Sequence, residues 1–190
     1  EEHKHVYSNL ITPLMFIERS SAVYPDKIAV IHGEQRYTYR EFGERVNRQA
    51  SALRKLGLQK GERVACLLPN IPAMLESHFG VLLAGGIIVP VNYRLAPAEI
   101  QYILDHSGAK VLFVDTEFFP LVAEIRESLP GLQHLIHVAD DPACPIPETQ
   151  DYEDFLATGS PDPVPWLVQD EFEEITINYT SGTTGRPKGV

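Results

Sequence analysis

Apolar and polar positions follow two alternating patterns between residues 63 and 138. Four short runs are apolar at almost every position, as is typical of parallel strands buried on both faces: 63–68, 87–91, 110–115 and 135–138. Between them lie longer stretches with apolar residues at helical spacing: 72–84, 97–108 and 117–129. Strand–helix–strand repeats of this length predict right-handed parallel crossovers, and therefore a doubly wound α/β layer.

The part of the chain before residue 63 predicts a helix, a hairpin and a second helix. The first helix begins at Thr12-Pro13, a capping hydroxyl followed by proline at the first helical position. The hairpin has two short strands about a Gly33-Glu34 turn: 28–32 and 35–39. The second helix covers about 40–56, with a capping box at its start and a glycine at its end: Thr38-x-x-Glu41 and Gly57.

The chain changes character after Val138. Seven of the fifteen prolines fall between Pro130 and Pro165, with acidic residues among them. We interpret this part as an acidic surface connection that contains a short helix at 151–157 and an extended stretch at 160–165. The resulting division is an α/β layer, this connection, and a strand with a loop that opens the next sheet: 1–138, 139–169 and 170–190.

The last strand leads into the stretch that carries the chemistry. Residues 173–179 alternate between apolar and polar, which predicts a half-buried strand. The twelve residues 179–190 read Tyr-Thr-Ser-Gly-Thr-Thr-Gly-Arg-Pro-Lys-Gly-Val and contain no acid. Glycines let a backbone approach a ligand closely, while hydroxyls and a lysine can bind phosphate oxygens. This combination predicts a polyphosphate site.

The spacing of this loop differs from that of the Walker loop, in which Gly-Lys-Ser/Thr opens a helix. Lys188 follows Gly185 by three positions, and Gly-Val comes after it. A strand–loop–strand phosphate cradle is therefore favoured over a cradle at the start of a helix. The alternative for the loop is a glycine- and threonine-rich hairpin that binds nothing.

Charge and composition narrow the classes of function. The formal net charge is −10, and residues 127–185 hold twelve Asp or Glu but no Lys or Arg. Without a basic stripe, nucleic acid is not expected as a partner. Two cysteines are too few for a disulfide framework or a cysteine-based zinc site. The longest uncharged run, 77–93, is broken by glycines and a proline, so no transmembrane segment is expected and the cytoplasm is the expected compartment.

The loop resembles the signature phosphate loop of the adenylate-forming superfamily, which includes acyl-CoA ligases, luciferases and peptide-synthetase adenylation domains. Further landmarks resemble the N-terminal part of acyl-CoA ligases in the same order: Thr12-Pro13-Leu14, Tyr37-Thr38-Tyr39-x-Glu41, Gly61-Glu62-Arg63-Val64 and Pro90-Val91-Asn92-Tyr93-Arg94-Leu95. The resemblance covers nearly the whole chain. It implies an incomplete N-terminal domain of the adenylate-forming fold, a layered, mostly parallel sheet with flanking helices.

The resemblance implies a two-step reaction in which a carboxylic acid, in the first instance a fatty acid, attacks ATP and the acyl group then passes to coenzyme A. ATP, Mg²⁺ and coenzyme A are the implied cofactors and co-substrates. The residues implied to hold the ATP phosphates are Thr180, Ser181, Gly182, Thr183, Thr184, Gly185 and Lys188. In the family the adenylation lysine and the magnesium ligand come later, so no catalytic and no metal residue is assigned here. We expect this chain to be part of a longer ligase and to be inactive on its own.

Two alternatives remain open. In the first, the chain is a non-catalytic module that binds ATP or a partner. In the second, it is part of a luciferase-like or peptide-synthetase enzyme, since members of these groups share the loop. Unpaired strand edges in a partial domain would favour self-association, so a homodimer is a further expectation. Polar residues outside the loop are interpreted as structural or surface groups: His3, His5, His78, His106 and Arg94.

Overall fold

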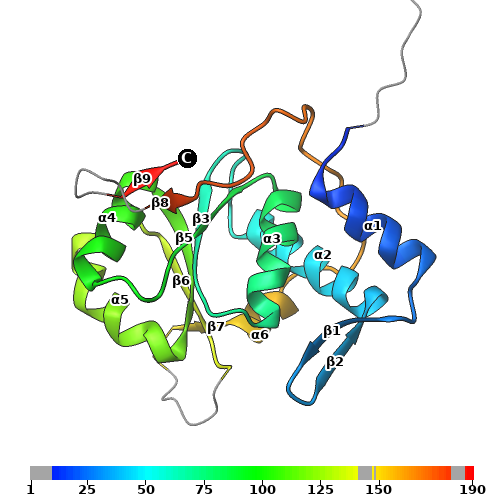
Figure 1. Cartoon of the computed structure of the whole chain (residues 1–190), viewed down its shortest axis with the longest axis horizontal. Helices are drawn as coiled ribbons and strands as arrows, with labels where there is room; N and C mark the ends of the chain where they lie inside the picture. The colour runs from blue at the N-terminus through cyan, green and yellow to red at the C-terminus, as the bar shows by residue number, and fades with distance from the viewer. Residues whose placement is uncertain (1–9, 141–146, 148, 181–186) are drawn as a thin grey trace, which may run out of the picture.

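Five parallel strands form the central sheet within the part of the chain that the computed structural model describes, residues 10–140, 147, 149–180 and 187–190. Their order is β4-β3-β5-β6-β7 (Figure 1). The strands are β3 Arg63–Leu67, β4 Ile87–Pro90, β5 Ala109–Asp115, β6 His134–Val138 and β7 Gln150–Asp151. The first four confirm the predicted strands. The fifth is two polar residues long and carries no apolar pattern, so it could not be predicted from the sequence.

Helices cover both faces of the sheet. Successive side chains along a strand therefore point alternately into two cores, one on each face. Val64 and Cys66 point toward the core shared with α2 and α3, whereas Ala65 and Leu67 point toward the core shared with α4 and α5. These helices are α2 Tyr39–Lys55, α3 Pro72–Ala84, α4 Pro97–Ser107 and α5 Phe119–Ile125. The order of the strands places β3 between β4 and β5, so the chain reverses its direction of winding at this point. The predicted doubly wound α/β layer is confirmed (Figure 1).

The N-terminal elements follow the predicted order. They are α1 Pro13–Val23, β1 Ile28–His32 and β2 Gln35–Thr38, and β1 pairs with β2 in an antiparallel hairpin. The capping box at the start of α2 is present in full, with Thr38 and Glu41 each accepting from the other's backbone N–H. The predicted side-chain cap at Thr12 is wrong. Thr12 is only 4% exposed, and its hydroxyl makes no hydrogen bond to the described residues, so burial sets its orientation.

The predicted helix over 117–129 is shorter than expected. The chain instead forms a 3₁₀ turn at Thr116–Phe118, the helix α5 at Phe119–Ile125 and a second 3₁₀ turn at Arg126–Ser128. Pro120 explains the late start. In a helix beginning at residue 117 its ring would meet the carbonyl one turn earlier, whereas α5 places it in the first turn, where proline is tolerated.

The acidic connection contributes to the core, contrary to its interpretation as surface. It contains α6 Tyr152–Ala157, which confirms the predicted short helix. Tyr152, Phe155 and Leu156 are each at most 2% exposed and pack with the core of α2 and α3. Their spacing of three and four residues puts them on one helix face, a signal that the surrounding prolines and acids obscure. The division of the chain at residues 138 and 170 remains a prediction.

A single glycine sets how closely the chain beyond α6 approaches α2. A Cβ atom built on Gly159 would lie 2.0 Å from the Arg48 carbonyl oxygen, a backbone atom that cannot move aside alone. We therefore expect Gly159→Ala to lower the free energy of unfolding by about 1–3 kcal/mol, the usual cost of overpacking, in urea denaturation. Gly131→Ala is the matched control, because nothing lies within 4 Å of its built Cβ. Equal stability of the two variants would contradict this account.

The described residues include no helix long and apolar enough to cross a membrane. Cys66 lies in β3 and is fully buried, as the sequence predicts. Burial raises the pKa of its thiol to about 12, against a smaller lowering by a hydrogen bond with Ser77. Cys66 is therefore a small core residue, and its thiol is not a nucleophile.

Candidate phosphate-binding hairpin

Two short antiparallel strands carry the described ends of the predicted phosphate loop. β8 Tyr179–Thr180 pairs with β9 Lys188–Gly189, with Tyr179 opposite Gly189 and Thr180 opposite Lys188. Two backbone hydrogen bonds between Asn178 and Val190, of 2.8 and 2.9 Å, extend the pairing. The predicted strand–loop–strand arrangement is therefore confirmed only for these short flanks. The predicted strand over 173–179 is wrong in its extent, because Thr176 makes one isolated bridge and regular strand pairing begins at Tyr179.

The segment just before the hairpin joins the edge of the central sheet at β4, while the hairpin itself is a separate two-stranded sheet. Ile88 of β4 forms a parallel bridge to Thr176, with backbone hydrogen bonds of 3.1 Å to the Ile175 carbonyl and 2.9 Å from the Ile177 N–H. Since the pairing is parallel and β4 ends at Pro90, the hairpin lies just past the carboxyl end of that strand. Open α/β sheets bind their ligands at this end. In Figure 1, β8 and β9 lie beside α4.

The structure brings together the two described residues of the predicted site. Thr180 and Lys188 are cross-strand partners, so their side chains leave the same face of the hairpin. Both residues are exposed. Within the described part of the chain, Lys188 makes no ion pair with an acidic side chain, so its ammonium group can meet an anion from solution. The other predicted phosphate ligands lie outside the described residues: Ser181, Gly182, Thr183, Thr184 and Gly185.

The hairpin rests on the last turn of α4 through an aromatic cluster that the sequence analysis missed. The Tyr179 hydroxyl lies 2.8 Å from Nδ1 of His106, and the two rings meet edge to face with centroids 5.9 Å apart. The other side of the His106 ring stacks on Tyr102 at 5.2 Å. Burial, reinforced by Tyr102, raises the pKa of Tyr179, and Arg63 opposes this weakly. Tyr102 and His106 are four residues apart on a helix, the only signal that the sequence offered.

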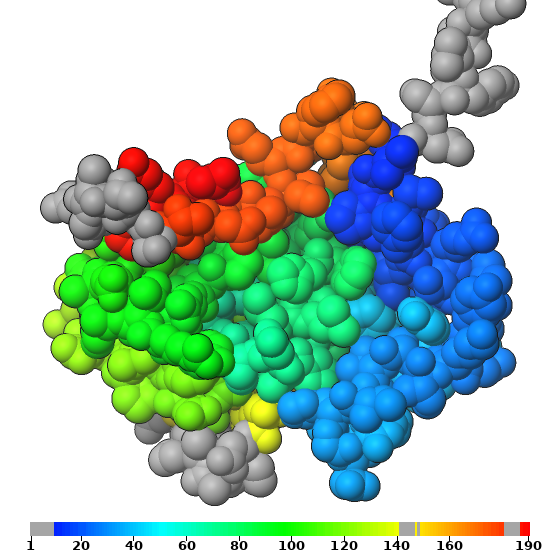
Figure 2. Space-filling model, in the orientation of Figure 1, coloured from blue at the N-terminus to red at the C-terminus, as the bar shows by residue number. Residues whose placement is uncertain are grey.

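The space-filling view shows how the hairpin is placed on the surface. The last described residues lie next to the green surface of α4, on the opposite side of the molecule from the blue hairpin β1–β2 (Figure 2). On this surface Thr180 and Lys188 are exposed among the described residues.

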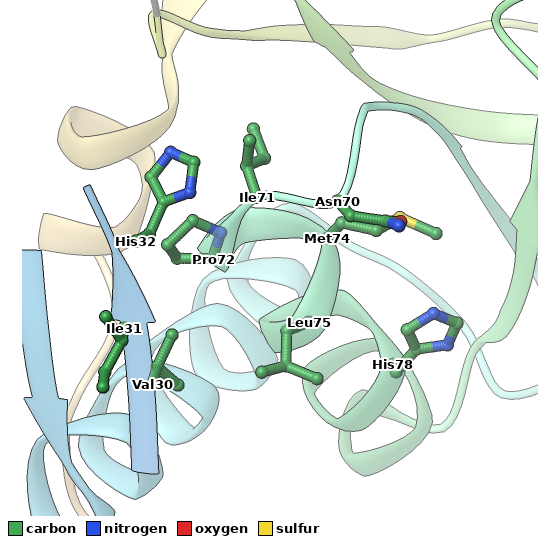
Figure 3. Close-up of a pocket in the computed structure, with 9 residues that line it drawn as sticks. All are labelled: Val30, Ile31, His32, Asn70, Ile71, Pro72, Met74, Leu75 and His78. Carbon is green, nitrogen blue, oxygen red and sulfur yellow. The ribbon is translucent and has the colours of Figure 1, made fainter. Parts of the chain in front are cut away.

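A separate hollow of about 310 Å³ lies between the β1–β2 hairpin and α3 (Figure 3). His32 reaches it from β1 and His78 from α3, and the rest of its wall is largely apolar: Val30, Ile31, Asn70, Ile71, Pro72, Met74 and Leu75. His32 is already hydrogen-bonded to Asp140 at 3.0 Å, and partial burial lowers the pKa of His78. No predicted site residue lines this hollow. The described residues contain no group of three His, Cys, Asp or Glu that could hold a metal ion.

The parallel α/β layer and the strand–loop–strand hairpin at its carboxyl edge together define a protein of the adenylate-forming class, of which this chain is the N-terminal part. A family model supports this class directly. The chain belongs to the AMP-binding enzyme family, whose model matches residues 17–190. This confirms the family suggested by the loop and the other landmarks.

Individual relatives and solved structures agree with this assignment. The chain is 38% identical over 186 residues to 4-hydroxybutyrate–CoA ligase 2 of Metallosphaera sedula, and 41% identical over 196 residues to a peroxisomal acetate/butyrate–CoA ligase of Arabidopsis thaliana. These alignments cover 96% and 95% of this chain but 34% of each relative. An anthranilate CoA ligase with bound anthranoyl-AMP superposes with a TM-score of 0.84 at 32% identity, covering 93% of this chain and 33% of that one. The chain thus spans about a third of the length of these relatives.

Proposed function

We propose that this chain is the N-terminal part of an ATP-dependent, AMP-forming carboxylate–CoA ligase. The complete enzyme activates a carboxylic acid, in the first instance a fatty acid, as an acyl-adenylate and transfers the acyl group to coenzyme A. The observation that carries the proposal is the hairpin, which presents Thr180 and Lys188 on one face at the carboxyl edge of the sheet, with no acidic partner of Lys188 among the described residues. The names of the relatives, which include ligases for acetate, butyrate and 4-hydroxybutyrate, support the same reaction class.

The chemistry that this hairpin would perform is charge neutralisation. A carboxylate is a weak nucleophile and ATP is highly anionic, so adenylation requires donors that hold the phosphates in line and stabilise the departing pyrophosphate. Lys188 supplies a positive charge, Thr180 a hydroxyl, and the predicted loop residues between them hydroxyls and backbone N–H groups. Arg186 is assigned no role.

Magnesium does not fit this part of the molecule as a protein-held ion. Mg²⁺ is held by carboxylates and phosphate oxygens, and no Asp or Glu lies after Glu174. The hairpin therefore offers the ion no carboxylate, and this chain's residues are not assigned as its ligands. A cytoplasmic location is part of the proposal, although several relatives carry the word peroxisomal in their names.

Pyrophosphate exchange tests the proposal in two proteins. The full-length gene product should incorporate labelled pyrophosphate into ATP when a carboxylic acid is supplied, with fatty acids of increasing chain length compared against acetate and benzoate. The chain 1–190 alone should show no exchange above background, because the family's adenylation lysine lies beyond it. Failure of every acid with the full-length protein would overturn the ligase proposal. Exchange by the isolated chain would show that its residues suffice for adenylation, and would overturn the assignment of no catalytic residue to it.

A further inference from the structure

The hairpin is too short to hold its own shape. β8 and β9 are two residues each, and an isolated two-stranded hairpin is marginally stable even when longer. Among the described residues, one isolated bridge connects its segment to the main sheet, between Ile88 and Thr176, three residues before Tyr179. The contacts that fix the hairpin must therefore come from side chains beneath it.

Tyr179 provides such contacts for both strands, together with Ile177, whose Cγ2 atom would lie 3.0 Å from a Cβ built on Gly189. Tyr179 belongs to β8, and its ring lies under β9, since a Cβ built on Gly189 would be 3.2 Å from its Cζ atom. Glycine at this position lets the returning strand approach the ring. The tyrosine hydroxyl then bonds to His106, which Tyr102 supports from the other side. Movement of this ring would displace Thr180 on one strand and Lys188 on the other.

The end of α4 that carries His106 is itself held to the sheet by hydrogen bonds. His106 lies in the last turn of α4, and the carbonyl oxygens of the next two residues, Ser107 and Gly108, accept hydrogen bonds from the Arg63 guanidinium. Arg63 is the first residue of the central strand β3, so it ties this end of α4 to the sheet. A continuous set of contacts therefore runs from β3 through α4 and His106 to the ring that supports both strands.

We propose that His106 is a positioning residue for ATP binding, which acts through the Tyr179 hydroxyl to hold Thr180 and Lys188 in register. The proposal rests on the proposed function, because it takes the hairpin to be the phosphate site. His106 contacts no substrate in this account. Its effect is exerted on the nucleotide and not on the acid, since the hairpin is the element that it supports.

The test uses the full-length protein and separates ATP from acid. His106→Ala should raise the KM for ATP in pyrophosphate exchange about three- to tenfold, the value of one net hydrogen bond, while the KM for the acid stays within twofold. His106→Asn, which can keep a polar atom near the Nδ1 position, should recover most of the loss. Tyr179→Phe should match His106→Ala, and the double variant should be no worse than either, because both remove the same bond.

His78→Ala is the matched control, since His78 is a helical histidine on α3 that lines the separate hollow beside β1 rather than the hairpin. An unchanged KM for ATP in both His106→Ala and Tyr179→Phe, or effects of the two that multiply in the double variant, would overturn the proposal. If His106→Ala does not fold, Tyr179→Phe decides the matter alone, because it removes one oxygen atom. If Lys188→Ala loses activity while the His106 variants keep the native KM for ATP, only the positioning role of His106 is refuted. Unchanged activity in Lys188→Ala would refute the phosphate site itself.

Discussion

Replacing Lys188 with alanine in the full-length protein should lower acid-dependent pyrophosphate exchange by a factor of about 10²–10³, the usual loss when one preorganised donor is removed from a developing negative charge. Lys188 is exposed and has no acidic partner among the described residues, so its charge is available to the phosphates. The loss should appear in both kcat and the KM for ATP, because the lysine would contact the nucleotide before and during pyrophosphate release.

The controls for this variant separate charge from fold. Lys188→Arg keeps the charge and should lose less activity than Lys188→Ala. Lys27→Ala removes another exposed lysine, whose Nζ lies over the Tyr24 ring, and should leave exchange within twofold of the native value. Thermal unfolding should be unchanged in all three variants, since Lys188 supports no buried contact. Native exchange rates in Lys188→Ala would remove the hairpin as the phosphate site.

The second large effect is expected for stability, at Arg45→Ala. Arg45 lies in α2 and pairs with Glu76 of α3 at 2.5 Å and Glu153 of α6 at 2.6 Å. Burial lowers the pKa of this guanidinium, but hydrogen bonds to the two carboxylates more than compensate and raise it above its ordinary value. The Glu76 side chain is 0% exposed, and its other described contact is the Tyr152 hydroxyl, which donates at 2.7 Å.

Removing the arginine would leave a buried carboxylate without its counter-charge. Such a loss costs about 3–5 kcal/mol, which should appear as a lower midpoint in urea denaturation. Arg40→Ala is the matched control, because Arg40 pairs with Asp26 on the surface, with the two side chains 58% and 87% exposed, and such pairs contribute about 0–1 kcal/mol. Arg45→Ala combined with Glu76→Gln should recover part of the loss. Equal effects of Arg45→Ala and Arg40→Ala would refute the role of this ion pair.

Two kinds of feature could be predicted from the sequence. They are strands buried on both faces, which are apolar at almost every position, and helix ends, which depend on residues close by in the chain. β3 and β5 are buried on both faces and show this at almost every position, while Gly57, Gly85 and Gly108 mark helix ends by their positive φ angles. β7 could not be predicted, because two polar residues acquire strand structure only by pairing with β6. Likewise, the sequence predicted the helix α6 but not its burial, since its partners lie far earlier in the chain: Arg45, Glu76 and Phe113.

In the candidate site, too, some features could be predicted from the sequence and others could not. The alternation over 173–179 and a loop spacing unlike that of the Walker loop predicted the strand–loop–strand flanks, while the glycines, hydroxyls and lysine of residues 179–190 predicted phosphate binding. The contact between His106 and Tyr179 joins residues 73 positions apart, and a lone histidine gives no indication of its partner. The sequence alone suffices to propose phosphate-binding residues, whereas the residues that support the hairpin could be identified only from the packing of α4 against it.

The position of α6 also determines the order in which the chain can assemble during synthesis. Arg45 and Glu76 emerge from the ribosome early, but Tyr152 and Glu153, which complete their hydrogen bonds, follow about eighty residues after Glu76. Until then the buried pair and the adjoining apolar faces of α2 and α3 remain open to water. Domains fold as units while synthesis proceeds from the N-terminus, and long-range contacts form slowly. The growing chain therefore carries an incomplete core through the synthesis of its central sheet, and becomes able to close that core only when the acidic connection has emerged.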